Sequence, residues 1–391
     1  MSDAAIPVMH FSNTRVRGGA EEHILTLLRG LNRNSFRLHL VCSPEVAEAV
    51  GADLPKDVEL LPLRFGLPSD LGSAVRLRTW IRGRRIQVLH SHLSYSSWFA
   101  SPVGWSCGVP LIVETPHIRE LWRKGWRANT AFDRMAARFV DRFIAVSHAN
   151  AKYLVEHKGL PVRKIRVIQN GSDLSRFNPA HVAPDGMREE LGIAPADAVL
   201  LVAARLEPQK GHAVLLDAMP TVLREFPNAK LVCLGEGVLR DQLEQQSQRL
   251  GLQASLRFVG FRRNVDDWLA LCDFTVLPSF YEGLPLVAVE SLAAGRTMVA
   301  SAVDGTPEVI VNGRTGITVP AGDSRALSEA ICMLLRSHTL RDRLAEEGRA
   351  WVLERFTQER QVRETGELYL EALGQAKVSD TCAERRQAVA Q

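Results

Sequence analysis

The sequence predicts an α/β protein made of two doubly wound, Rossmann-like domains that face each other across a cleft. Short apolar runs alternate with longer amphipathic stretches along the chain, which is typical of parallel sheets covered by helices on both faces. The 391 residues are enough for two domains of ordinary size. A turn-rich segment near the middle separates two halves with the same pattern.

The apolar runs predict the strands, because each is short and most are followed by a stretch with helical spacing. The first half contains Pro7–Phe11, Arg37–Cys42, Val58–Leu63, Ile86–His90, Leu111–Glu114, Phe143–Val146 and Ile165–Ile168. The second half contains Ala198–Ala203, Ala229–Leu234, Ser255–Val259, Phe274–Leu277, Met298–Ser301 and Gly316–Val319.

The boundary between the halves is marked by turn-forming residues. Asn170-Gly171 is a strong turn dipeptide, and residues 177–184 contain two prolines and no periodicity. We therefore expect a first domain over residues 1–175 and a second over 176–356. A last helix over 357–375 is expected to pack back on the first domain, followed by a flexible tail over 376–391.

Composition excludes several classes of protein. No apolar run approaches the ~18–20 residues that span a bilayer, and the first residues do not resemble a signal peptide. The six scattered cysteines contain no CxxC pair, so we expect reduced thiols in a cytoplasmic protein. Residues 1–178 hold 25 basic and 15 acidic side chains, whereas the remainder holds 23 and 29. The basic half indicates either an anionic partner or a solvated, arginine-rich surface.

The densest motif follows the strand expected at Phe274–Leu277. Gly283 permits an unusual turn, and Pro285 suits the first position of a helix. The helix start would offer free amides and a positive dipole to an anion such as a diphosphate. Glu282 and Glu290 suit acceptors for sugar hydroxyls, although surface carboxylates would give the same spacing.

Two further loops of the second half carry candidate phosphate ligands. Arg205 and Lys210 lie between a strand and a helix, where they can grip phosphate oxygens or form an exposed basic loop. Gly235-Glu236-Gly237 weakly resembles a glycine-rich phosphate loop. Because the full G-x-G-x-x-G fingerprint is absent there, an NAD site is disfavoured.

In the first half, Gly18-Gly19 precedes the helix expected over Glu21–Leu31. The paired glycines allow a ligand to approach a helix start, or they form a flexible connector. His90, His92 and His117 follow expected strands and so lie near the predicted cleft. Each histidine alone is equally compatible with a structural role.

Together these segments resemble glycosyltransferase family 4, whose members are retaining enzymes with the GT-B architecture. The resemblance covers roughly residues 6–370. It rests on Gly18-Gly19-Ala20-Glu21, His90-x-His92, the segment from Val167 to Asp173 with Phe177-x-Pro179, Arg205-Leu206-x-x-x-Lys210-Gly211, Gly235-Glu236-Gly237, Phe258-Val259-Gly260, the segment from Ser279 to Pro285, and Glu290.

The resemblance implies a role for each matching residue in the second domain. Arg205 and Lys210 would bind the donor diphosphate, together with the amides of Gly283 and Leu284. Glu282 would contact the hydroxyls of the donor sugar.

Four further donor-site roles follow from the same resemblance. Glu290 would contact the nucleotide ribose, and Glu236 is also assigned to the donor site. From the first domain, Gly18 and Gly19 would approach the donor, and His117 would lie near the reacting sugar. The expected catalytic set is therefore Glu282, His117, Arg205 and Lys210.

Two positions depart from the common family pattern and leave the donor preference open. Gln169 stands where proline is commoner, and Asp304-Gly305-Thr306 stands where a Gly-Gly pair is frequent. Asp266-Asp267 is the only candidate metal pair, and helix capping explains it. We expect no metal and no cofactor, because the two cations can stabilise the leaving diphosphate.

The expected activity is transfer of a hexose-type sugar, with retention, from a nucleotide diphosphate sugar, UDP-linked rather than GDP-mannose. The acceptor would be a glycan, a glycolipid or a lipid-linked molecule in the synthesis of surface polysaccharide or lipopolysaccharide. No nucleic-acid partner is expected. A nucleotide-sugar epimerase, a transferase to a small soluble acceptor and a non-catalytic binding subunit remain alternatives.

Residues 118–142 are basic and aromatic. Trp122 and Trp126, with Arg123, Lys124 and Arg127, predict peripheral contact with an anionic membrane on its cytoplasmic face. Phe132, Met135 and Phe139 share one helical face in the same stretch, and that face is more typical of a core.

Overall fold

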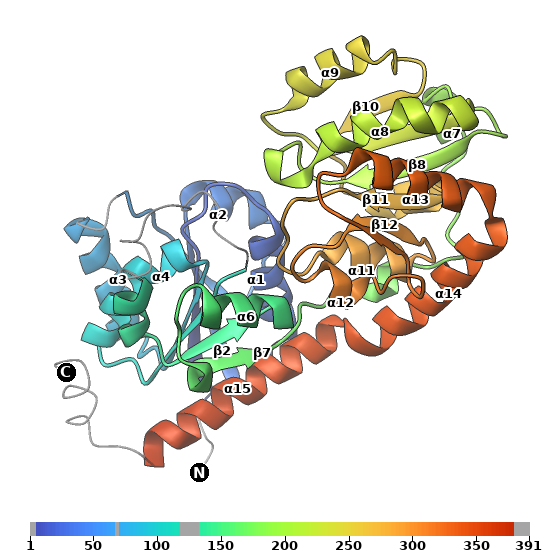
Figure 1. Cartoon of the computed structure of the whole chain (residues 1–391). Coiled ribbons are helices and arrows are strands. Elements are labelled where there is room, and N and C mark those ends of the chain that lie inside the picture. The colour runs from blue at the N-terminus through green and yellow to red at the C-terminus, as the bar shows by residue number, and fades with distance from the viewer. Residues whose placement is uncertain (1–4, 67–69, 118–132, 379–391) are drawn as a thin grey trace. The chain divides into compact units, whose positions relative to one another are not determined.

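The computed structural model of the chain describes residues 5–66, 70–117 and 133–378. These residues form two compact units (Figure 1). Unit 1 comprises the chain up to Asn170 together with the residues from Gln358 onward, and unit 2 is Gly171–Thr357. The division falls within the Asn170-Gly171 turn, a few residues before the boundary expected at 175.

Unit 1 is built on a seven-stranded, wholly parallel sheet. Its strands are β1 (Ile6–Phe11), β2 (Phe36–Cys42), β3 (Glu59–Pro62), β4 (Val88–His92), β5 (Leu111–Thr115), β6 (Arg142–Ala145) and β7 (Ile165–Val167). The order across the sheet is β3-β2-β1-β4-β5-β6-β7. The winding reverses between β1 and β4, and in such sheets ligands bind beyond the carboxyl ends of the strands at the reversal.

Helices cover both faces of this sheet. They are α1 (Gly19–Gly30), α2 (Pro44–Val50), α3 (Leu71–Gly83), α4 (Ser94–Ser106), α6 (His148–Glu156) and α15 (Gln358–Val378), with 3₁₀ turns at Ala137–Phe139 and Val162–Lys164. Helices α1, α2 and α15 share one apolar core, and α3, α4 and α6 share the other. In β1, Val8 faces the first core, whereas Met9 and Phe11 face the second. Burial on both faces explains why the strands are continuous apolar runs.

Unit 2 repeats this plan with six parallel strands. They are β8 (Ala198–Ala203), β9 (Ala229–Leu234), β10 (Leu256–Gly260), β11 (Phe274–Leu277), β12 (Met298–Ser301) and β13 (Ile317–Val319). The order is β10-β9-β8-β11-β12-β13, so the winding reverses between β8 and β11. All thirteen expected strands form, with ends displaced by at most two residues, and the predicted fold class is confirmed.

The helices of unit 2 also form two layers. They are α7 (Met187–Glu190), α8 (His212–Glu225), α9 (Arg240–Arg249), α10 (Val265–Leu271), α11 (Leu286–Ala293), α12 (Thr306–Val309), α13 (Ser324–Arg336) and α14 (His338–Arg355), with 3₁₀ turns at Leu174–Arg176 and Pro208–Lys210. Helices α10, α11 and α14 contribute to one core, and α8 and α13 to the other.

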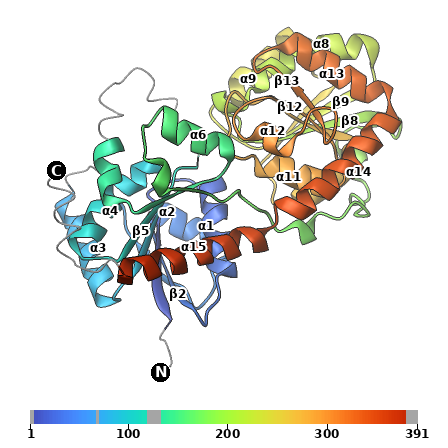
Figure 2. The ribbon, with the colours of Figure 1, turned by 60° about the horizontal axis from the view of Figure 1, so that its bottom comes forward.

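The last helix, α15, lies against α1 in unit 1 (Figure 2). Val362, Leu368 and Tyr369 are buried in the same core as the apolar face of α1. A Cβ atom on Gly30 would lie 2.7 Å from Val362 Cγ2, so this glycine permits close approach of the two helices. The helix continues to Val378, past the end expected at residue 375, and residues 379–391 of the expected tail are outside the described range.

Every helix in the described parts of the chain is too short or too polar to cross a bilayer. The membrane-contact segment with Trp122, Trp126, Arg123, Lys124 and Arg127 falls among residues 118–132, outside the described ranges.

Tyr369 anchors α15, since its ring is fully buried and its hydroxyl lies 2.6 Å from His90 Nδ1. We expect Tyr369→Ala to lower the free energy of unfolding of unit 1 by about 3–5 kcal/mol, because it leaves a large cavity. Leu370→Ala is the matched control: its side chain is 48% exposed, and a change of under about 0.5 kcal/mol is expected. Urea denaturation followed by circular dichroism measures both, and equal losses would show that α15 is not anchored by its buried face.

Candidate active site

The loops that follow β8 and β11 meet at the reversal point of unit 2 through a buried ion pair. Lys210 Nζ lies 2.6 Å from Glu282 Oε1, and the two side chains are 16% and 6% exposed. Ser279 Oγ donates a second hydrogen bond, at 2.7 Å, to the same carboxylate oxygen. A carboxylate this deeply buried requires such partners. The cation and the carboxylate expected from the sequence as separate donor ligands are therefore direct partners.

Backbone contacts hold the same two loops together. Gln209 Nε2 donates to the carbonyl of Tyr281 at 2.9 Å, and the amide of Phe280 donates to the carbonyl of Gln209 at 2.8 Å. Gly211 has φ +66°, and a Cβ atom there would lie 2.0 Å from the carbonyl oxygen of Pro278. Only glycine fits this position without displacing a loop, so Gly211 sets the distance between the two loops.

Asp304 supports the Glu282 backbone from a third loop, after β12. Its Oδ2 accepts a hydrogen bond from the amide of Glu282 at 3.0 Å. Its φ of +44° lies in the left-handed region, which aspartate tolerates better than most residues. In the sequence, Asp304 is noticeable only as a departure from a Gly-Gly pattern. The structure shows that its side chain holds the backbone of Glu282 in place.

Arg205 is more loosely held than Lys210. Its side chain is 54% exposed, and Nη1 lies 3.3 Å from Glu207 Oε1. Surface ion pairs of this kind are worth about 0–1 kcal/mol. The guanidinium can therefore exchange Glu207 for a phosphate at little cost.

The glycines beside Glu236 have a structural explanation. A Cβ atom on Gly235 would lie 2.1 Å from the carbonyl oxygen of Ala204, and one on Gly237 would lie 2.4 Å from that of Leu206. These glycines let the loop after β9 pack on the loop after β8. This packing accounts for both glycines by itself, whereas the Glu236 side chain is exposed.

Gly283 and Leu284 come directly before α11, and Glu290 lies within it. Leu284 is buried in the core of unit 2, so only its backbone is available to a ligand. Pro285 is the N-cap of α11 and not its first residue, which corrects the sequence prediction. Glu290 Oε1 accepts a hydrogen bond from Ser172 Oγ at 3.1 Å, and thus has a different partner from Glu282.

The Asp266-Asp267 pair lies in the first turn of α10, but the expected capping role is wrong. The N-cap residue is Asn264. Asp267 accepts hydrogen bonds from Asn264 Nδ2 at 2.7 Å and from His181 Nε2 at 2.6 Å. The carboxylate therefore binds side chains and not the free amides of the helix.

In unit 1, Gly18 is the N-cap of α1, and Glu21 binds the loop in front of it. The Glu21 carboxylate accepts hydrogen bonds from the amide of Gly18 at 2.9 Å, from Ser12 Oγ at 3.1 Å and from Thr14 Oγ1 at 2.5 Å. Burial raises the pKa of Glu21. A Cβ atom on Gly19 would meet no described atom within 4 Å, so the space beside the helix start is open to a ligand.

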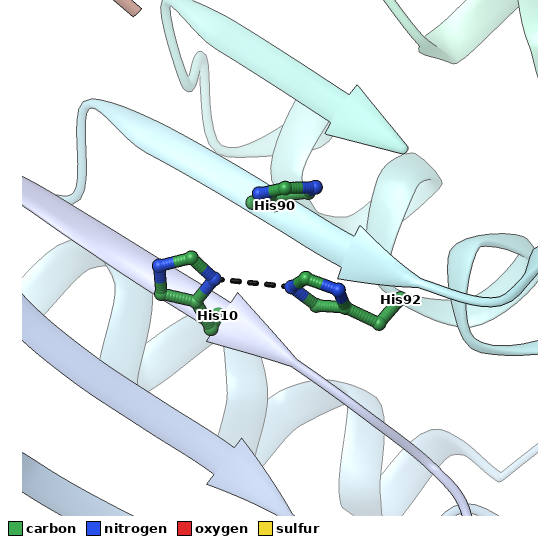
Figure 3. A group of neighbouring side chains, drawn as sticks. All are labelled: His10, His90 and His92. Carbon is green, nitrogen blue, oxygen red and sulfur yellow. Dashed lines mark hydrogen bonds between the residues drawn. The ribbon is translucent and has the colours of Figure 1, made fainter. Parts of the chain in front are cut away.

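His90, His92 and His117 do come together, and two histidines that the sequence analysis missed join them. His10 lies on β1, directly opposite His90 of β4, and His23 lies on α1. His10 Nδ1 is 3.1 Å from His92 Nε2 (Figure 3), and His92 Nδ1 is 3.2 Å from His117 Nε2. Burial lowers the pKa of His10 to about 3 and that of His23 to about 4.

Comparison with known proteins identifies the family to which this chain belongs. Residues 17–176 match the family model described as Glycosyltransferase Family 4, and residues 185–351 match that of glycosyl transferases group 1. The glycogen synthase of Mycobacterium tuberculosis is 31% identical over 305 residues, which cover 75% of this chain and 70% of that protein. The chain belongs to glycosyltransferase family 4.

Two further proteins are similar to this glycosyltransferase, one in sequence and one in structure. The D-inositol 3-phosphate glycosyltransferase of Streptomyces scabiei is 29% identical over 371 residues, covering 83% of this chain and 80% of that protein. The crystal structure of Anabaena Alr3699/HepE in complex with UDP-glucose superposes with a TM-score of 0.81 at 20% identity, covering 95% of this chain and all of that one. That structural likeness shows the GT-B type of fold.

The close contact between the loops after β8 and β11 can be tested by substituting Gly211, with a second glycine as the control. We expect Gly211→Ala to lower kcat/KM at least tenfold, because the methyl group forces Pro278 and the loop of Glu282 away from Lys210. Gly251→Ala is the control, since Gly251 has φ +68° but no described atom within 4 Å of a Cβ position. It should carry only the backbone strain of about 1–2 kcal/mol. Steady-state kinetics on both variants decides the point, and equal losses would assign the effect to strain alone.

Proposed function

We propose that this glycosyltransferase moves a hexose from a UDP-sugar, with retention of anomeric configuration, to a glycan, a glycolipid or a lipid-linked acceptor. The observation that carries the proposal is the buried Lys210–Glu282 pair at the reversal point of unit 2. It combines a cation suited to a diphosphate with a carboxylate suited to sugar hydroxyls, at the sheet edge where doubly wound domains bind nucleotides. The UDP-glucose bound by the structurally similar Anabaena protein supports the choice of base.

The diphosphate is the leaving group, so the site must stabilise negative charge that grows as the anomeric bond breaks. Lys210 is held in place by Glu282, and Arg205 lies on the same loop. The start of α11 adds backbone amides at Gly283 and Leu284. Fixed donors of this kind act without reorganising during the reaction. The proposed reaction therefore needs no metal ion.

The two glutamates would divide the donor between them. Lys210, Ser279 and the contact of its own amide with Asp304 hold Glu282 in place. A carboxylate held in this way is suited to accept hydrogen bonds from the donor sugar and so to orient it. Glu290 accepts a hydrogen bond from the Ser172 hydroxyl, and a ribose hydroxyl of the nucleotide would donate to the same carboxylate in the same way. From unit 1, we assign Gly18, Gly19 and His117 to the donor on the strength of the family resemblance.

Retention follows if the acceptor attacks the face that the leaving group vacates. A hydroxyl oxygen of the acceptor forms a bond to the anomeric carbon while the bond from that carbon to the phosphate oxygen breaks. The hydroxyl proton passes to the departing diphosphate, so the protein need not supply a base. This scheme requires only the charge stabilisation that Arg205 and Lys210 provide.

The acceptor class rests on charge and on relatives. The excess of basic residues in 1–178 favours an anionic acceptor or surface. Similarity to the glycogen synthase supports a glycan as the acceptor. Similarity to the D-inositol 3-phosphate glycosyltransferase supports the alternative, a small soluble acceptor, which would be anionic. An epimerase would convert the donor in the absence of any acceptor, which separates it from both.

Arg205 is a cleaner probe of the donor site than Lys210, because Lys210→Ala also leaves the buried Glu282 without its cation. We expect Arg205→Ala to weaken UDP binding about 10–100-fold, as for loss of a charge-assisted hydrogen bond. When both proteins are assayed in a buffer that contains a chelator, the turnover of Arg205→Ala should be ~10²–10³-fold lower than that of the wild type. Arg325→Ala is the control, because Arg325 forms a comparable exposed pair with Glu329. Native UDP affinity in Arg205→Ala, by isothermal calorimetry, would overturn the diphosphate assignment.

The division of roles between the glutamates predicts two different profiles. Glu282→Gln should reduce transfer of the sugar by at least tenfold and leave UDP affinity within a few fold, because the group contacts the sugar. Glu290→Gln should weaken binding of UDP and of the UDP-sugar together. Calorimetry with UDP and with UDP-glucose, combined with turnover, distinguishes the two. Equal losses of UDP affinity would mean that the roles are wrongly divided.

A further inference from the structure

Five histidines are buried together at the reversal point of the unit 1 sheet: His10, His23, His90, His92 and His117. Within this cluster, two triads can each bring one nitrogen per residue within 4.8 Å of one another: His10 with His90 and His92, and His23 with His92 and His117. Imidazole nitrogens in such numbers are typical of sites for zinc and related divalent ions. The proposed sugar transfer uses none of this nitrogen cluster except His117.

The hydrogen bonds of His90 argue against the first triad. His90 Nδ1 lies 2.6 Å from the Tyr369 hydroxyl, and Nε2 lies 2.7 Å from Thr115 Oγ1. Both ring nitrogens of His90 are therefore engaged by groups outside the histidine cluster, and His90 must give up Tyr369 or Thr115 to bind an ion. In the second triad, the contact that an ion would replace lies between two of its own ligands, His92 Nδ1 and His117 Nε2. The ring of His90 lies close to that of His92 (Figure 3); the ring centroids are 4.2 Å apart and the planes are tilted by 31°.

In the second triad, one ring nitrogen of His23 is available to bind an ion. His23 Nδ1 lies 2.9 Å from both Asn170 Oδ1 and Gln361 Nε2. His23 Nε2 is buried and has no hydrogen-bond partner among the described residues. When Nδ1 donates to Asn170, Nε2 carries a lone pair, and when Nδ1 accepts from Gln361, Nε2 carries the proton. Binding of an ion at Nε2 requires the first tautomer. A metal-binding histidine is held in this way, by a carbonyl oxygen on its other nitrogen.

The spacing of the second triad matches a single tetrahedral ion. With Zn–N bonds of about 2.0–2.1 Å, two ligand nitrogens lie about 3.4 Å apart and two ring centres about 5.2 Å apart. His92 Nδ1 and His117 Nε2 are 3.2 Å apart. The three ring-centre distances are 4.7 Å for His23–His117, 5.4 Å for His23–His92 and 5.5 Å for His92–His117.

His10 contacts the ring nitrogen of His92 that would not bind the ion. For His92 to bind an ion through Nδ1, its proton must lie on Nε2. His10 Nδ1, at 3.1 Å, can accept that proton in a hydrogen bond. His10 and Asn170 are thus placed to accept the ring protons that His92 and His23 carry when they bind an ion, as outer partners do in known sites.

We propose that His23, His92 and His117 bind one divalent ion of the zinc class, with a fourth position left for water or another ligand. The ion is not a participant in the proposed transfer. Since it would hold His117, occupancy is expected to inhibit transfer, a clause that rests on the proposed function. Binding itself does not depend on that function.

Metal titration of the full chain, after chelator treatment, tests the site directly. We expect one equivalent of Zn²⁺ to bind in competition with a chromogenic chelator, and Co²⁺ to give the visible absorption of a tetrahedral site. His23→Gln and His117→Gln should each abolish the Co²⁺ band. Asn170→Ala should weaken Zn²⁺ affinity about 10–100-fold, as for loss of an outer partner.

Two variants serve as controls. His90→Gln removes a member of the rejected triad, and His39→Gln removes a buried histidine of β2 outside both triads. Both should bind Zn²⁺ with native stoichiometry. Circular dichroism in chelator verifies that each variant is folded, and His117→Gln, next to the end of β5, provides the test if His23→Gln does not fold. Absence of stoichiometric binding in the wild type, or binding lost in His90→Gln but kept in His23→Gln, would overturn the proposal.

Discussion

The order of the unit 2 site depends on the ion pair between Lys210 and Glu282. Neither group can be buried alone, because an unpaired charge in the protein interior is costly. Each therefore fixes the loop that carries the other, and the loops of β8 and β11 become one surface. The site is ordered by the same charges that are proposed to bind the donor. A ligand that draws Lys210 toward a phosphate thus also acts on the position of Glu282.

The fold was predictable because both sheets are parallel and buried on both faces. Strands such as Ala198–Ala203 and Ala229–Leu234 are continuous apolar runs, whose ends can be read without knowing their neighbours. The candidate site was predictable in part, since Arg205, Lys210 and Glu282 follow such strands. Their pairing was not, because a single sequence does not reveal which loops of a sheet lie side by side.

The contacts that could not be predicted from the sequence are of two kinds: some join residues that are remote in the chain, and others involve a residue whose local pattern already had an ordinary explanation. Asp304 binds the amide of Glu282 from another loop, and His10 meets His92 across two adjacent strands. Glu21 looked like a helix-start residue and is one, but it also holds Ser12 and Thr14. The doubly wound order, which places β1 beside β4, would have brought His10 next to His90 and His92.

Because α15 returns to unit 1, unit 2 is an insertion within unit 1 and is joined to it by two connections. During synthesis, all of unit 2 leaves the ribosome before the residues that complete the core of unit 1, Tyr369 among them. Unit 2 can therefore finish folding first, while the apolar face of α1 is not yet covered by α15. For the same reason, an exchange of donor-binding units between relatives requires two junctions, one at Asn170–Gly171 and one at Thr357–Gln358.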